Sequence, residues 1–250
     1  MAVVSWQDAY LAKYYPPSSG WIDGETEFRR LCAASIRPGS EILEIGSGPP
    51  NSTSRFLSSL GRVTGVDVDP DVRTNDALVA AHVLSDETYP LPDCGFDACV
   101  SDYVIEHIAD PESHLREVAR VLKPGGVYVF RTPNRFHYVT LAARLTPHWF
   151  HVLVANRLRN LPADSHQPYR TSYRMNSTAS IRAAAAAARL EVEELRLLEK
   201  DPWYGRSSRA LFLLFMLYER LVNSHEVFAG LRANFLATLR KPQNHAGTSA

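Results

Sequence analysis

The stretch Glu41-Ile-Leu-Glu-Ile-Gly-Ser-Gly-Pro-Pro50 decides the fold. Residues 41–45 have the apolar character of a buried strand. Gly46 and Gly48 then predict a turn in which the backbone approaches a ligand closely or adopts a positive φ. Glu44 stands two residues before the first glycine, and a carboxylate there suits a ligand with an ammonium group better than a polyphosphate.

A second carboxylate follows about twenty residues later. Val63-Thr-Gly-Val-Asp-Val-Asp-Pro70 predicts an apolar strand that ends at Asp67. An acid at the end of the second strand of a βαβ unit can bind a ribose diol through both oxygens. A solvent-exposed or capping aspartate is the alternative, and Asp69 before proline has the pattern of an N-cap. A dinucleotide is disfavoured, because the sixth position of the glycine fingerprint is Asn51.

A third strand is expected over Ala81-His-Val-Leu-Ser-Asp86. Asp86 at its end is a candidate acceptor for a hydrogen bond from an adenine amino group, and Glu87 competes for this role. Open parallel sheets bind ligands at the carboxyl ends of their strands, which is where these acids would gather.

Two further strands and a helix complete this part of the chain. Strands are expected at 96–101 and 127–132. Between them Asp110-Pro111 begins a helix with proline in its first turn. Apolar residues from 115 to 122 recur at helical spacing, and Lys123-Pro-Gly-Gly126 ends the helix.

These motifs together resemble the class I S-adenosylmethionine-dependent methyltransferases, above all their quinone, sugar and natural-product branch. The matching residues are Glu44-Ile-Gly-Ser-Gly48, Val66-Asp67, Leu91-Pro92, Phe96-Asp97, Glu106-His107, the run 115–126 and Thr132-Pro-Asn134. The resemblance is close over about residues 40–134 and general elsewhere. The sequence departs from the family pattern at Pro49 and Pro50, where many relatives carry a third glycine. The two prolines remove two amide N–H donors from the turn.

The resemblance implies an α/β fold with a doubly wound, seven-stranded, mostly parallel sheet. Its sixth strand is expected at 190–198 and its antiparallel seventh strand at 233–239. It also implies S-adenosylmethionine as cofactor and S-adenosylhomocysteine as product. The residues expected to bind the cofactor are Glu44, Gly46, Ser47, Gly48, Asp67, Val68, Asp86, Glu87 and Ser101.

Two insertions are expected within a methyltransferase domain of residues 39–250. Residues 135–175 precede the next core helix at 177–189, and their length and aromatic content favour a lid. The second insertion, about 202–230, holds an apolar run too short to span a bilayer. Through about residues 208–222 it would form a buried lid helix, a homodimer contact or a peripheral membrane contact.

Residues 1–38 form a separate, aromatic N-terminal cap segment in this interpretation. Trp21 is placed near the methionine end of the cofactor, with packing on the sheet as the alternative. The residues expected to face the substrate are Trp21, Asn134, His137, Trp149, Tyr169 and Tyr173.

The expected chemistry follows from the cofactor, whose sulfonium methyl is already electrophilic. The protein then mainly aligns an acceptor lone pair with the carbon–sulfur bond. A base is needed only for a hydroxyl or a protonated amine. His107 is the candidate base, since it follows the fourth strand and histidine titrates near neutral pH. The alternative is a structural histidine bonded to a backbone carbonyl.

Composition agrees with a cytoplasmic enzyme. The chain has 27 Lys and Arg and 27 Asp and Glu, so no electrostatic argument favours nucleic acid. Cys32, Cys94 and Cys99 lack metal-ligand spacing and are expected to be reduced thiols, and no metal site is expected. The N-terminus has neither a basic region nor a long apolar run, so no signal peptide is expected.

The favoured function is methyl transfer from S-adenosylmethionine to a small aromatic or lipophilic acceptor, with an oxygen atom as first choice. Carbon or nitrogen methylation of a quinone, isoprenoid lipid or natural product is the alternative. A cofactor-binding scaffold without transferase activity is a hypothesis of a different class. The acceptor, the methylated atom and the oligomeric state stay open.

Overall fold

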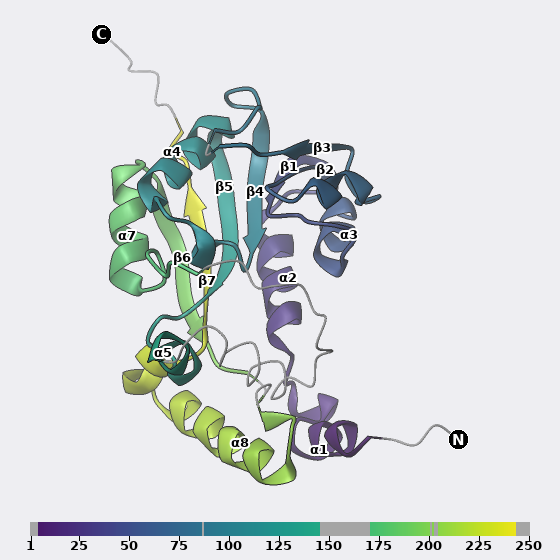
Figure 1. The fold of residues 1–250 in the computed structure, drawn as a ribbon, viewed down its shortest axis with the longest axis vertical. Helices are drawn as coiled ribbons and strands as arrows, with labels where there is room; N and C mark the ends of the chain where they lie inside the picture. Colours follow the sequence, from purple (N-terminus) through teal and green to yellow (C-terminus); the bar gives the residue numbers. More distant parts are fainter. Residues whose placement is uncertain (1–4, 87, 146–170, 201, 203–204, 244–250) are drawn as a thin grey trace. The chain divides into compact units, whose positions relative to one another are not determined.

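The computed structural model describes residues 5–86, 88–145, 171–200, 202 and 205–243. They belong to two compact units (Figure 1), which we treat separately. The sheet unit comprises Phe28–Arg135, Tyr169–Arg196 and Asn234–Ala250. The helical unit comprises Met1–Glu27, Phe136–Pro168 and Leu197–Ala233.

The sheet has seven strands in the order β3-β2-β1-β4-β5-β7-β6. Their bounds are β1 Ser40–Ile45, β2 Gly61–Asp67, β3 Ala80–Val83, β4 Phe96–Asp102, β5 Leu122–Pro133, β6 Glu191–Leu198 and β7 Asn234–Arg240. β1 pairs in parallel with β2 and β4, whereas β5 pairs antiparallel with β7. The expected doubly wound sheet is therefore confirmed. The strand order reverses between β1 and β4, and ligands of such sheets bind at this switch point.

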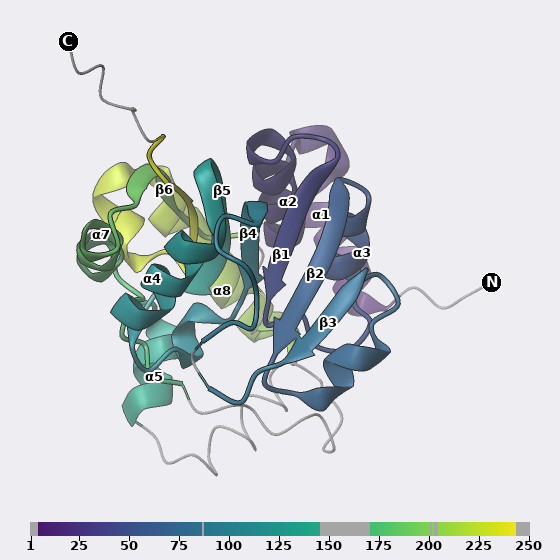
Figure 2. The ribbon, with the colours of Figure 1, turned by 90° about the horizontal axis from the view of Figure 1, so that it is seen from above.

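Helices cover both faces of the sheet. α4 (Pro111–Val121) and α7 (Thr178–Ala187) lie on one face, and α3 (Ser52–Ser58) lies on the other (Figure 2). Asp110 caps α4 by accepting the N–H groups of the second and third helical residues. Ser177 caps α7 in a capping box with Ser180. Both starts agree with the sequence analysis.

The structure corrects two boundaries. The third strand ends at Val83, so Asp86 belongs to the following loop instead of the strand end. β5 begins at Leu122, directly after α4, and therefore includes the Lys-Pro-Gly-Gly segment that was expected only to end the helix. The reason is pairing, because Leu122 is already in register with Phe96 of β4.

The connection between β2 and β3 differs from the doubly wound pattern, in which an α-helix links successive strands. The connection from β2 to β3 contains only a short 3₁₀ segment, η2 (Pro70–Thr74), with Asp69 as its N-cap. It brings Asn75, which is buried, back over the start of α3.

The helical unit contains α1 (Trp6–Tyr14), η1 (Pro17–Ser19), α5 (Tyr138–Leu145), α8 (Arg209–Ser224) and η5 (Glu226–Leu231), while α2 (Gly24–Ser35) crosses from it into the sheet unit. Its centre is Phe212 of α8, which is fully buried. The rings of Trp6, Tyr10, Tyr14 and Tyr15 surround Phe212 at centroid distances of 5.4–6.4 Å. These four N-terminal aromatic residues thus pack on α8, a partner that the sequence analysis did not anticipate.

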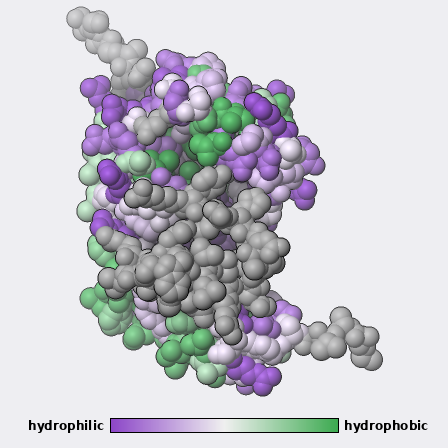
Figure 3. All heavy atoms as spheres, in the orientation of Figure 1, coloured by the Kyte–Doolittle hydropathy of each residue, from purple (hydrophilic) through white to green (hydrophobic). Residues whose placement is uncertain are grey.

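α8 also presents apolar side chains to solvent. Leu214, Leu217 and Leu221 are 57%, 61% and 56% exposed, and their spacing places them along one stripe of the helix. Apolar residues gather along the lower left edge of Figure 3, where Figure 1 shows α5 and α8. Among the described residues, no helix has the length and apolar character to cross a membrane.

Candidate active site

The turn after β1 has the geometry that its two glycines predict. Gly46 has φ +71° and Gly48 has φ +55°, values that favour glycine. The N–H of Gly46 donates to Val66 O at 2.8 Å, which continues the β1–β2 pairing into the turn. A Cβ atom on Gly46 would lie 2.3 Å from Val104 Cγ2, so this position also requires glycine because of close packing.

Asp67 is fixed in place at the end of β2. Its Oδ2 accepts the N–H of Gly48 at 2.8 Å and its Oδ1 accepts the N–H of Asp69 at 2.8 Å. A carboxylate has about four lone-pair positions, so each oxygen can still accept from a ribose hydroxyl. Val68, next along the chain, is 60% exposed.

Glu44 is buried at the end of β1, with only 4% of its surface exposed. Ser54 Oγ donates to Glu44 Oε2 at 2.7 Å. Burial raises the pKa of Glu44 to about 7, while the Ser54 hydrogen bond opposes the rise. A nearby ligand cation would favour the ionised form and so draw the carboxylate into an ion pair.

The sequence analysis missed the polar side chains that support this turn. Asn51 caps α3 by accepting the N–H groups of Thr53 and Ser54. Asn75 reaches the same place from the end of η2 and donates to Ser54 Oγ at 2.9 Å. The Asn-x-x-Ser pattern at 51–54 carried a detectable capping signal. Asn75 carried none, because its contacts are with residues distant in sequence.

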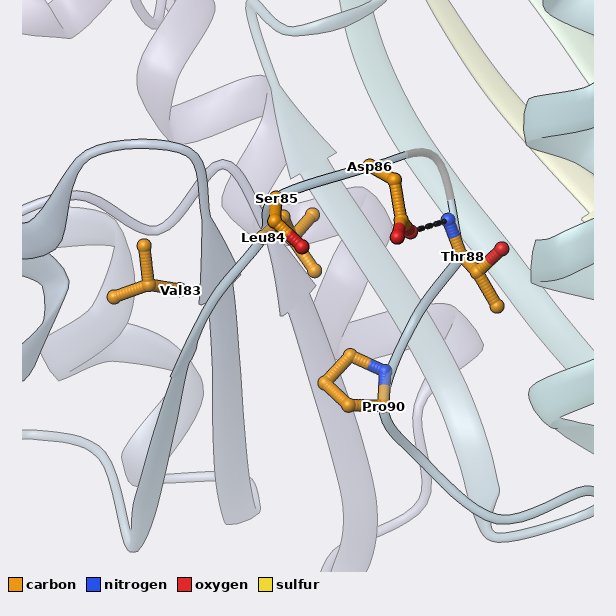
Figure 4. Close-up of a pocket in the computed structure, with 6 residues that line it drawn as sticks. All are labelled: Val83, Leu84, Ser85, Asp86, Thr88 and Pro90. Carbon is orange, nitrogen blue, oxygen red and sulfur yellow. Dashed lines mark hydrogen bonds between the residues drawn. The ribbon is translucent and has the colours of Figure 1, made fainter.

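A pocket of about 280 Å³ lies beyond β3 (Figure 4). Its lining residues are Val83, Leu84, Ser85, Asp86, Thr88 and Pro90. Asp86 Oδ1 accepts the N–H of Thr88 at 2.8 Å, an interaction drawn in Figure 4. Asp86 thus lies in a pocket even though it is not at a strand end. Glu87 lies outside the described residues.

Ser101 occupies a different environment from the other cofactor candidates. Its side chain is fully buried, and its Oγ lies 2.7 Å from the hydroxyl of Tyr128. Tyr128 also contacts His114 Nε2 at 3.1 Å, and His114 Nδ1 contacts the hydroxyl of Tyr89 at 3.1 Å. Burial lowers the pKa of His114 to about 4, so the imidazole is neutral in this network. The Ser101 side chain is thus engaged within the sheet unit, and its role at the cofactor stays a prediction.

The segment after β4 carries an aromatic ring that the sequence analysis did not select. Tyr103 has φ +58° and is 40% exposed. The Arg131 guanidinium lies 4.6 Å from its ring centroid and forms two 2.7 Å hydrogen bonds to Asp102. The Tyr103 hydroxyl donates to Asn234 Oδ1 at 3.2 Å. These contacts hold a strained residue at the switch-point edge of the sheet.

His107, the candidate base, ends the 3₁₀ segment η3 (Ile105–His107) and is partly buried. Its neighbour Glu106 is buried and accepts a hydrogen bond from Thr132 Oγ1 at 3.1 Å. Burial raises the pKa of Glu106 to about 7. The Glu106 carbonyl accepts the N–H groups of Ser172 and Tyr173 at 2.6 Å and 3.1 Å. The Glu106 carboxyl, with its raised pKa, and the His107 imidazole are therefore adjacent in this turn.

The candidate substrate residues fall in both units. Asn134 is buried in the sheet unit, where Tyr173 has φ +48°. Trp21 belongs to the helical unit, with its ring 5.0 Å from that of Tyr15. His137 lies there too.

The surroundings of His137 are polar as well as aromatic. Its Nε2 atom is 3.3 Å from Glu199 Oε2, and both side chains are nearly inaccessible to solvent. Trp149 and Tyr169, together with most of the expected lid, lie outside the described residues. No group of three or more potential metal ligands occurs in the described parts of the chain.

Comparison with known proteins finds methyltransferases. Residues 43–130 match the family described as a methyltransferase domain. A malonyl-[acyl-carrier protein] O-methyltransferase of Serratia marcescens is 34% identical over 108 residues, 42% of this chain and 42% of that protein. A ubiquinone biosynthesis O-methyltransferase of Paracidovorax citrulli is 26% identical over 223 residues, 78% of this chain and 86% of that protein. Several of the curated relatives are matched over only 33–46% of their length.

Solved structures share the fold. A geranyl diphosphate C-methyltransferase from Streptomyces coelicolor, solved with S-adenosyl-L-homocysteine, has a TM-score of 0.55 at 15% identity, covering 87% of this chain and 80% of that one. Residues 43–130 thus match a methyltransferase domain, and the sheet order and the glycine turn with its two acids agree with the class I S-adenosylmethionine-dependent methyltransferase fold.

The donor and acceptor groups of this edge fit that cofactor. Glu44 offers a carboxylate for the ammonium group, and Asp67 offers one for the ribose hydroxyls. The pocket around Asp86 offers an acceptor for the adenine amino group. Gly48 leaves room for the ligand, because a Cβ built there would meet only Asp67 Oδ2, at 3.9 Å.

Proposed function

We propose that the protein transfers a methyl group from S-adenosylmethionine to a small-molecule acceptor. The observation that carries this proposal is the pair of fixed acids at the switch point. Asp67 is held by the Gly48 N–H at 2.8 Å, and Glu44 is held by Ser54 Oγ at 2.7 Å. When bound, the cofactor supplies an electrophilic sulfonium methyl. The chain therefore has to bind the cofactor, orient the acceptor and exclude water.

The acceptor that we propose is aromatic or lipophilic, with oxygen as the methylated atom. The ubiquinone biosynthesis relative supports an aromatic oxygen acceptor, because it matches over most of both chains. The geranyl diphosphate enzyme supports the alternative of carbon methylation on an isoprenoid. Tyr103 supports an aromatic acceptor, since a partly exposed ring lies at the edge where the cofactor acids gather.

His107 is the base in this proposal. An oxygen acceptor must lose its proton as the methyl group arrives, and a partly buried histidine beside the end of β4 can take it. Glu106 is the competing base, because its pKa lies near 7. Its carboxylate is buried and bonded to Thr132, so it is less accessible to a substrate than His107.

Turnover tests this function directly. Formation of S-adenosylhomocysteine is measured with phenolic, quinol and carboxylic acceptors, and the product is examined by mass spectrometry and NMR to locate the methyl group. His107→Ala should lower kcat by about 10²–10⁴, whereas Glu106→Gln should leave kcat within a few-fold. The reverse ranking would assign the proton transfer to Glu106. If the protein binds the cofactor but turns over none of these acceptor classes, the result would favour the hypothesis of a non-catalytic scaffold.

Three expectations stay predictions. One is the boundary between a cap segment, residues 1–38, and a methyltransferase domain with two insertions. Another is a lid formed by residues 135–175. The last is a membrane or homodimer contact through about residues 208–222, which the three exposed leucines of α8 support. Vesicle sedimentation and light scattering separate the two kinds of contact.

A further inference from the structure

Ser54 lies behind Glu44 with every hydrogen-bonding position of its hydroxyl filled. Its oxygen accepts from Asn51 Nδ2 and from Asn75 Nδ2, each at 2.9 Å. It donates to Glu44 Oε2 at 2.7 Å. A hydroxyl has one proton and two lone pairs, so the two carboxamides leave Glu44 as the acceptor for that proton.

The direction of these hydrogen bonds follows from how the carboxamides are anchored. Asn51 Oδ1 accepts the N–H groups of Thr53 and Ser54, both at 2.9 Å. Asn75 Oδ1 accepts the N–H of Ala77 at 3.2 Å. With the oxygens held by backbone donors, the amino groups must point toward Ser54. The network therefore has a single proton arrangement that ends on the Glu44 carboxylate.

The same carboxamides support the Pro49-Pro50 turn. Asn75 Nδ2 lies 3.2 Å from Gly48 O and 3.3 Å from Pro49 O. Asn51 Nδ2 lies 2.6 Å from Ser47 O and 3.0 Å from Pro49 O. Each amino group has two protons for three acceptors, so some of these bonds are shared. Prolines supply no N–H of their own. Asn75 thus ties the cofactor turn to the crossover after β2.

We propose that Asn75 is a positioning residue for the amino-acid end of the cofactor. It holds the turn from outside and, through Ser54, aims the Glu44 carboxylate at the ligand's ammonium group. Asn75 is itself buried and acts without touching the ligand. This inference rests on the proposed cofactor site and adds a residue that no local sequence pattern marks.

Two ligands separate positioning from general support. S-adenosylhomocysteine carries the amino-acid end, whereas 5′-methylthioadenosine lacks it and keeps the ribose and adenine. Calorimetry compares both ligands on the intact chain carrying Asn75→Ala or Asn75→Asp. Thr74→Ala is the matched control, because Thr74 is exposed and its hydroxyl donates to Asp71 O, away from the turn.

Asn75→Ala should weaken S-adenosylhomocysteine binding at least about fivefold, the order expected for one net hydrogen bond, with methylthioadenosine binding nearly unchanged. Asn75→Asp should weaken S-adenosylhomocysteine further, because a carboxylate would face the carbonyls of Gly48 and Pro49. Ser54→Ala is the second variant if either protein fails to fold. It should give the same selective loss and move the pH midpoint of binding upward, since Ser54 favours ionised Glu44.

Two results would overturn the inference while leaving the cofactor site intact. One is unchanged S-adenosylhomocysteine affinity in all of the Asn75 and Ser54 variants that fold. The other is an equal loss for both ligands, which would make Asn75 a general support of the turn. If the wild-type protein binds neither ligand, the proposed function fails together with the inference.

Discussion

The sheet unit and the helical unit are stabilised by different kinds of contact. At the cofactor edge, short polar side chains bind main-chain groups a few residues away, as Asp67 binds the N–H of Asp69. In the helical unit, aromatic rings from the first fifteen residues pack on Phe212, about two hundred residues later. The comparison teaches that chemistry encoded in local turns can be predicted from sequence, whereas long-range packing between aromatic residues cannot.

The largest expected effect tests the first half of this comparison. Gly46→Ala should abolish S-adenosylhomocysteine binding, because the new Cβ would lie 2.3 Å from Val104 Cγ2 in a residue with φ +71°. Gly39→Ala is a matched control, since Gly39 has φ +81° with no atom within 4 Å of an added Cβ. The control should lose only about 1–2 kcal/mol of stability to backbone strain and retain binding in calorimetry. An equal loss of binding in both variants would mean that backbone strain, and not close packing against Val104, explains the glycine at position 46.

The next prediction concerns the helical unit. Phe212→Ala should reduce the free energy of unfolding by about 3–5 kcal/mol, because it removes the ring on which four aromatic residues pack. Leu217→Gln on the same helix should change it by less than about 0.5 kcal/mol, since Leu217 is 61% exposed. Urea denaturation measures both. Similar costs for the two variants would contradict the packing assignment.

Asp67→Ala should weaken S-adenosylhomocysteine binding at least tenfold, because hydrogen bonds to a charged group contribute about 1.5–3 kcal/mol. Asp71→Ala removes the same charge four residues away, at an exposed position, and should bind like wild type. Calorimetry with a circular-dichroism check of folding makes the comparison. Equal affinities in the two variants would refute the ribose assignment.

A further prediction is a pH dependence of binding. The pKa of Glu44 is raised to about 7 by burial, so its ionised fraction falls as the pH drops below 7. Affinity for an ammonium-bearing ligand should fall with it, by up to about tenfold per pH unit. Glu44→Gln should remove this dependence in calorimetry, while Glu106→Gln should preserve it. A wild-type affinity that stays constant from pH 5 to pH 8 would contradict the role of Glu44.

Stability without ligand should respond to pH in the opposite direction. A carboxyl whose pKa is higher in the folded state than in the unfolded state binds more protons when folded. Its contribution is therefore present below pH 4.5 and is lost as the pH rises through 7. Glu44→Gln should accordingly stabilise the unliganded protein more at pH 8 than at pH 5. His114 acts with the reverse sign between about pH 6.5 and pH 4, so the variant is compared with wild type at each pH.

Particular residues show why part of the site was predictable. Gly46 and Gly48 require their residue type for geometric reasons, and Asp67 lies at the end of a strand that its apolar pattern reveals. Most strand positions, the start of α4 at Asp110 and the start of α7 near residue 177 also follow from local patterns. The caps of α4 and α7 rest on contacts that span only a few positions, whereas Gly46 and Asp67 are marked by residue type and strand position although they also contact Val104 and Gly48, which are distant in sequence.

The residues that were missed depend on distant partners. Asn75 contacts Gly48, which lies 27 positions earlier, and Tyr103 is held by Arg131 and Asn234 from other strands. Asp86 was placed at a strand end because its apolar run continues, but β3 stops at Val83, the last residue that pairs with β2. Tertiary pairing overrode the local pattern there.

A calorimetric titration of the wild-type chain with S-adenosylhomocysteine tests the central claim most directly. Saturable binding of one ligand per chain is expected near pH 8, and it should be lost in Gly46→Ala and weakened at least about tenfold in Asp67→Ala. Absence of binding by a folded wild-type protein, or equal binding by all three proteins, would contradict the assignment of this sheet edge as the cofactor site.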